Sequence, residues 1–121
     1  MAFINDEVFD QGLDWADTNG TRIDICSTEP TTYAEATTTY TLGNSTITTG
    51  SPADRTGGGR EVTVGAVSDA SVTGTGTAAF YAITDGTANL YATGSLTTSQ
   101  SVTTGNTFSL GSFTIGIPDP A

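Results

Sequence analysis

The chain has 121 residues, enough for one domain or for one domain with an arm. Three Arg and no Lys oppose 13 acidic residues, giving a formal net charge of −10, which argues against binding nucleic acid or anionic membranes, because both need clustered cations. The absence of His removes the commonest general base and imidazole metal sites, and the lone Cys26 excludes an intrachain disulfide and a multi-cysteine zinc site.

The composition favours a β-rich fold with a thin core. Leu, Ile, Val and Phe together supply 23 residues, whereas Thr alone supplies 26. Thr is β-branched and suits a half-exposed pleated surface. A thin core at this length often depends on a partner surface for stability, so we expect a homo-oligomer or docking onto another protein.

Residues 1–21 are predicted to form an N-terminal helix or arm. Ile4, Val8 and Trp15 fall near one helical face within residues 4–19, Asn5 is the expected N-cap, and Asn19-Gly20 marks the end. One interpretation is a short amphipathic helix that covers a sheet. The other is an interaction arm that inserts aromatic side chains into a neighbouring subunit.

The alternating pattern of Arg22 to Ser27 predicts a strand, and Tyr33 to Leu42 is expected to extend as a second one. Residues 43–60 are predicted to be a Gly-rich loop that carries two of the three cations, Arg55 and Arg60. These two side chains could dock on an acidic neighbour or pair within the chain.

From Glu61 onward the sequence is nearly all β in pattern. Apolar residues alternate with polar ones around Val62, Ala82 and Leu90, which predicts strands there. Asp85-Gly86 predicts a hairpin turn that Thr87 could lengthen. A bulge is expected near Gly111. We therefore predict that residues 22–121 form a single β-rich domain, a small antiparallel β-sandwich or barrel.

The sequence predicts no catalytic residue, metal ligand or cofactor. Asp17 to Gly20 resembles part of a calcium loop, but Trp15 and Cys26 would occupy ligand positions, which leaves only a looser set of Asp14, Asp17 and Asn19. Helix capping explains that set more simply. A hydrolase that uses two carboxylates stays open, because 13 acidic residues always permit such a pair.

Several segments together resemble small Thr-rich proteins encoded among the structural genes of tailed bacteriophages. They are MAFINDEVFDQGLDW at the start, RIDICSTEPTTYAEATTTYTLGN at 22–44, SPADRTGGGREVTV at 51–64 and ATGSLTTSQSVTTGNTF at 92–108. The resemblance implies a non-enzymatic virion structural role and supplies no catalytic residues.

A virion location also reconciles two features of the sequence. The chain is poor in Lys and rich in Thr, Ser and Gly, as exported proteins are, yet its start lacks the pattern of a signal peptide. A virion protein is made in the host cytoplasm and works outside it. A secretion system that reads no N-terminal signal is the other explanation.

Within a virion, the expected role is a capsid decoration or cement protein that bridges capsid subunits, with the major capsid protein, other virion proteins and further copies of itself as partners. The alternative is a tail or fibre-associated module that binds host-surface glycans. The predicted docking surface consists of apolar arm residues with two polar contacts: Phe3, Ile4, Phe9 and Trp15, with Arg55 and Arg60.

Overall fold

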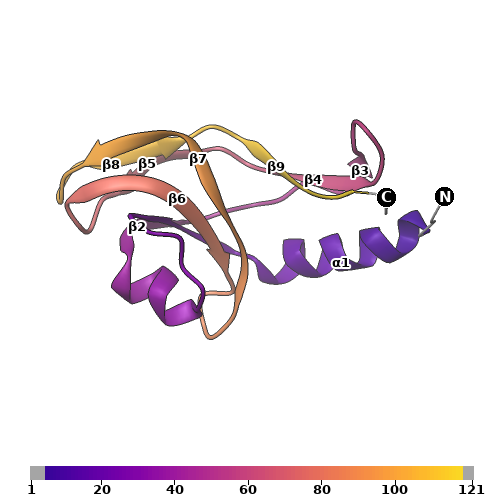
Figure 1. Ribbon diagram of the computed structural model, residues 1–121, viewed down its shortest axis with the longest axis horizontal. Coiled ribbons are helices and arrows are strands. Elements are labelled where there is room, and N and C mark those ends of the chain that lie inside the picture. Colours follow the sequence, from indigo (N-terminus) through magenta and orange to yellow (C-terminus); the bar gives the residue numbers. More distant parts are fainter. Residues whose placement is uncertain (1–4, 119–121) are drawn as a thin grey trace.

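The computed structural model describes residues 5–118, which form a mainly β fold with a helix at its N-terminal end (Figure 1). The elements in chain order are α1 (Asp6–Asn19), β1 (Arg22–Cys26), the π-helical turn η1 (Glu35–Thr39), β2 (Thr41–Thr46), β3 (Ala53–Asp54), β4 (Arg60–Val64), β5 (Val67–Ser71), β6 (Gly76–Thr84), β7 (Leu90–Val102), β8 (Thr107–Leu110) and β9 (Phe113–Ile117).

Antiparallel pairing arranges the strands as an open barrel flattened into a sandwich. One sheet has the order β2-β1-β6-β7. The facing layer consists of the three-stranded sheet β3-β4-β9 and the two-stranded sheet β5-β8. Bridges from Gly43 to Val72 and from Thr49 to Val64 connect β2 and the segment after it to the facing layer. The predicted antiparallel sandwich or barrel is therefore confirmed.

Within the facing layer, β4 and β5 pair with β9 and β8 as one long bent ribbon, and β3 adds a short third strand at one end. Strands β4 and β9 pair from Arg60 with Ile117 to Val64 with Phe113. The next pair, Val67 of β5 with Leu110 of β8, keeps the same register. Both strands change their inward face between these points, at 65–66 and 111–112, which is how strands turn a corner between sheets. The bulge expected near Gly111 is not there, because the register is unchanged across 111–112; the bulge lies on the opposite strand, between Val67 and Ala70 of β5.

The N-terminal helix begins and ends where the sequence predicts. The side chain of Asn5 accepts a hydrogen bond from the Glu7 amide, and the Gly20 amide closes the last turn on the Ala16 carbonyl. The face that packs on the sheets differs from the predicted one, because Phe9 and Leu13 are buried. The predicted face through Val8 and Trp15 points to solvent instead.

Two core clusters lie on opposite faces of β1. The larger one fills the space between the layers and includes Ile23 and Ile25 of this strand. The smaller one contains Cys26 and Ala82 and is covered by Ala36 of η1. A central strand that is buried on both faces therefore needs a cover on each side.

The predicted strand over Tyr33 to Leu42 is wrong in its first part, where the chain is helical through Thr39 and becomes β2 at Thr41. Thr31, Thr32 and Glu35 cap this turn: the Glu35 amide donates to Thr32 Oγ1, and the Glu35 carboxylate accepts from the amide of Thr31, one residue before Thr32, at 2.7 Å. This is the T-x-x-E capping signature, which outweighs the β propensity of the Thr residues that follow.

The predicted loop at 43–60 is also shorter than expected. Residues 43–46 belong to β2, and β3 and the start of β4 lie within the rest. The true turn is at Gly57 to Gly59, all with positive φ. Gly43 serves a different purpose, because a Cβ there would come within 2.7 Å of the Ser71 carbonyl and 2.8 Å of Phe108.

We predict that Gly43→Ala lowers the free energy of unfolding by about 1–3 kcal/mol, since the added methyl must displace packed neighbours. Chemical denaturation measures this change. Gly111→Ala is the matched control, because a Cβ at that position meets nothing within 4 Å. Its stability should be unchanged or raised by up to about 1 kcal/mol. Equal stability of the two variants would contradict the close approach at Gly43.

Candidate interaction surfaces

The outer face of α1 exposes two large apolar side chains. Val8 and Trp15 are 63% and 62% exposed, and they lie two turns apart on the same side of the helix. The helix also carries five acidic residues and no basic one: Asp6, Glu7, Asp10, Asp14 and Asp17. Of these, Glu7 and Asp14 are exposed beside the two apolar side chains, whereas Asp10 pairs with Arg60 of β4. The outer face therefore combines apolar anchors with flanking negative charge.

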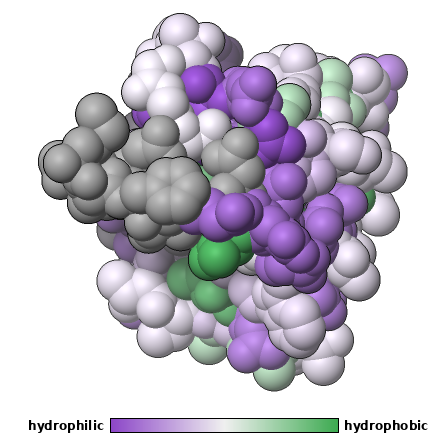
Figure 2. Space-filling model, turned by 90° about the vertical axis from the view of Figure 1, so that its right-hand side faces the viewer, coloured by the Kyte–Doolittle hydropathy of each residue, from purple (hydrophilic) through white to green (hydrophobic). Residues whose placement is uncertain are grey.

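The end of the molecule that carries the start of α1 faces the viewer in Figure 2. Hydrophilic side chains gather there around one small hydrophobic patch. Contiguous exposed apolar patches rimmed by polar residues are typical of protein-binding surfaces. Figure 1 places this end opposite the end formed by β5 and β8.

Arg60 fastens α1 to the sheets. Its guanidinium donates to both oxygens of Asp10 in α1, at 2.8 and 3.2 Å, and to Asp54 of β3 at 2.6 Å. These bonds, that to Asp10 foremost, raise the pKa of Arg60 further above its usual range. Of the two interpretations of this cation, the structure supports pairing within the chain.

Arg55 lies at the glycine turn rather than in a patch with Arg60. Its side chain donates to the Gly58 carbonyl at 3.1 Å and passes over Gly116 of β9, where a Cβ would come within 2.9 Å of the Arg55 Cδ. The role of this side chain in the structure is to close the turn against β9.

The six predicted docking residues are thus not brought together on one surface. Phe3 and Ile4 lie outside the described residues. Phe9 is buried on the inner face of α1, so it could contact a partner only if the helix left the sheets. Trp15 is the member that stands exposed, and its neighbour Val8 was missed because sequence periodicity assigned both residues to the inner face.

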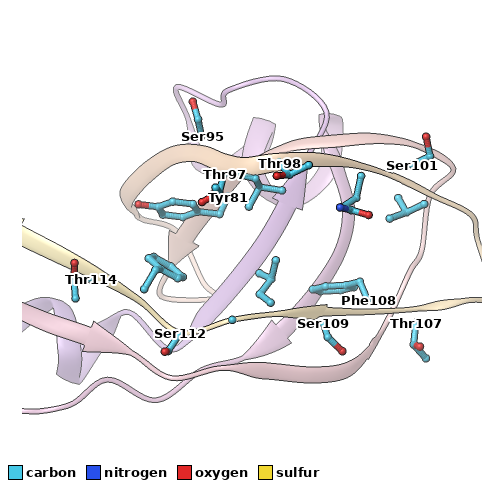
Figure 3. Close-up of a pocket in the computed structure, with 16 residues that line it drawn as sticks. Tyr81, Ser95, Thr97, Thr98, Ser101, Thr107, Phe108, Ser109, Ser112 and Thr114 are labelled. Carbon is cyan, nitrogen blue, oxygen red and sulfur yellow. The ribbon is translucent and has the colours of Figure 1, made fainter.

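A cleft of about 660 Å³ opens between β7 on one side and β8–β9 on the other (Figure 3). We call it the seam: residues from within 95–102 and 107–114, together with Tyr81 of β6. Tyr81 and Phe113 form a tilted aromatic pair across it, with ring centroids 4.6 Å apart. The ring of Tyr81 covers Gly94, where a Cβ would come within 2.7 Å.

Asp24 and Cys26 have structural roles in the core. Asp24 is fully buried, receives two hydrogen bonds from Arg22 at 2.7 and 3.0 Å, and accepts a third from Thr41. Burial raises the pKa of the Cys26 thiol to about 12, so this thiol stays protonated at neutral pH. Among the described residues, no group of three or more His, Cys, Asp or Glu is placed to hold a metal ion.

Comparison with known protein families, characterised proteins and solved structures finds no match to this chain. Within residues 5–118, no helix is both long enough and apolar enough to cross a membrane.

We predict that Cys26 of the folded protein resists alkylation in mildly alkaline buffer, because the thiolate is the reactive form and burial suppresses it. Mass spectrometry after iodoacetamide treatment should show labelling only when denaturant is present. The exposed neighbour supplies a control: in a Ser27→Cys variant, one label should appear rapidly under native conditions. Rapid labelling of native wild-type protein would contradict the buried position of Cys26.

Proposed function

We propose that this chain is a non-enzymatic structural protein of a tailed-bacteriophage virion, and that it binds the head as a capsid decoration or cement protein. The observation that carries the proposal is the outer face of α1, where Val8 and Trp15 are exposed among acidic residues. The sequence resemblance to small phage structural proteins points in the same direction.

The mechanism of docking follows from the chemistry of that face. A partner that covers Trp15 and Val8 gains about 1.5–3 kcal/mol for each side chain that it buries fully. The acidic residues of α1 favour a partner groove with Arg or Lys at its rim, and they speed the encounter with it. The partner in this proposal is the major capsid protein, with other virion proteins as neighbours.

Weak docking suffices for such a role. Contacts repeated at every position of a shell stabilise the particle collectively, without a tight single site. The Arg60 bridge to Asp10 matters here, because it holds α1 on the sheets while the outer face is engaged. The bound chain would then link neighbouring capsid subunits through a rigid helix.

Copy number tests this location against the alternative, a tail or fibre-associated module that binds glycans. Quantitative mass spectrometry of purified particles, relative to the major shell protein, should find hundreds of copies of a decoration protein. A handful of copies would move the chain to the tail tip or a fibre. Complete absence from particles would refute a virion role.

We predict that Trp15→Ala weakens binding to particles that lack the chain by about 30-fold or more, as loss of an interface hot spot of 2 kcal/mol does. Folding stability should change by less than about 0.5 kcal/mol, since the side chain is exposed. Co-sedimentation measures the binding. Thr87→Ala, an exposed change outside α1 in the loop after β6, is the control and should bind normally. Unchanged binding of the Trp15 variant would show that α1 is not the docking face.

A further inference from the structure

Three strand edges meet at the seam. β7 ends the four-stranded sheet, β8 ends the two-stranded pair, and β9 ends the three-stranded sheet. Four residues of β7, 96–99, lie opposite the single residue Ala79 of β6, because the pairs that flank them are Phe80 with Ser95 and Ala78 with Gln100. This part of β7 therefore has no ladder partner on β6 and forms a wide bulge in the edge strand.

The core of the molecule also reaches the surface here. Five partly buried residues that pack against the main core line the seam: Tyr81, Leu96, Val102, Leu110 and Phe113. Figure 3 shows Tyr81 and Phe108 lying between the strands that flank the opening. A chain seated in the seam would complete the core and the hydrogen-bonding edges at once.

Charge identifies the occupant. None of the 16 residues that line the seam is charged, and residues 70–118 contain a single charge, Asp85, in a chain with a net charge of −10. A basic partner would be drawn to the acidic N-terminal half instead. A second copy of this chain is repelled by the acidic surfaces, so the neutral seam is where two copies can approach with least electrostatic cost.

The edge strand β7 lacks the charged residues, Pro and short length that usually prevent such pairing, whereas β8 is short, with four residues. Natural proteins protect exposed edges with charged side chains, Pro or very short strands. The longest strand of the molecule, β7, is an edge strand of 13 residues without charge or Pro. Two bulges interrupt β7, at Tyr91 and at 96–99, and they leave Ala92 to Ser95 and Gln100 to Val102 as regular strand.

From these observations we infer that the seam is a self-association surface, in which a second copy of the chain pairs with the free edges of β7 and β8–β9. The surface is separate from the outer face of α1, so one chain can hold a copy of itself and a different partner together. The inference does not depend on a virion role, because it concerns the purified chain alone.

The test introduces a negative charge on each wall of the seam. Thr98→Asp changes β7 and Ser112→Asp changes the β8–β9 wall, and both residues are exposed. Thr46→Asp is the matched control: Thr46 is exposed on β2, at the opposite edge of the same sheet, and faces Arg22 across the ladder. Light scattering during size-exclusion chromatography gives the oligomeric state, and circular dichroism verifies that each variant is folded.

Wild-type protein and Thr46→Asp should form a dimer or larger assembly, and both seam variants should raise its Kd at least about tenfold. Hydrogen exchange should show amides of residues 96–99 protected in the assembly and exposed on dilution. A wild-type monomer at high micromolar concentration would overturn the inference, as would an assembly whose seam amides exchange freely. A seam that binds neutral oligosaccharide, or that becomes protected only on particles, would likewise replace the second copy with another occupant.

Discussion

The burial of β1 on both faces is the constraint on which the other elements depend. Ile23 and Ile25 face the main core, while Asp24 and Cys26 on the opposite side are equally inaccessible to water. A buried carboxylate is tolerated only with partners, and Arg22 and Thr41 provide them. The second face needs a cover of its own, and the helical turn η1 provides it through Ala36. The position of η1 and the start of β2 at Thr41 both follow from this requirement.

A second constraint is the separation of charge along the chain. The acidic residues are concentrated in α1 and the segments that follow it, whereas β6 to β9 are almost free of charge. The fold converts this sequence asymmetry into two chemically different surfaces. The acidic face with Val8 and Trp15 suits a basic, apolar partner, and the neutral seam suits a chain of like charge. In the two proposals made above, this division lets one surface meet a basic partner while the other meets a second copy.

Local signals accounted for the features that local interactions control. Asn5 and Gly20 mark the ends of α1 because capping depends on a few adjacent residues. The Asp85 carboxylate accepts hydrogen bonds from the backbone amides of Thr87, Ala88 and Asn89 and so shapes the turn after β6. These contacts are local, so the sequence could predict the lengthened hairpin loop. The helical segment at 33–39 was also readable, since Thr32 and Glu35 have the spacing of a helix cap, but the run of Thr residues pointed to a strand.

The amino-acid sequence by itself determined the β class, the helix limits, the acidic character and the absence of His-based chemistry, because composition and short-range pattern fix these properties. The tertiary structure alone decided which face of α1 is buried, that Arg60 is paired with Asp10 fifty residues away, and that three strand edges meet at one cleft. These features arise from contacts between distant segments. Phe9 and Trp15 show the difference: as residues of one helix they look alike in sequence, and only packing on the sheets buries one and exposes the other.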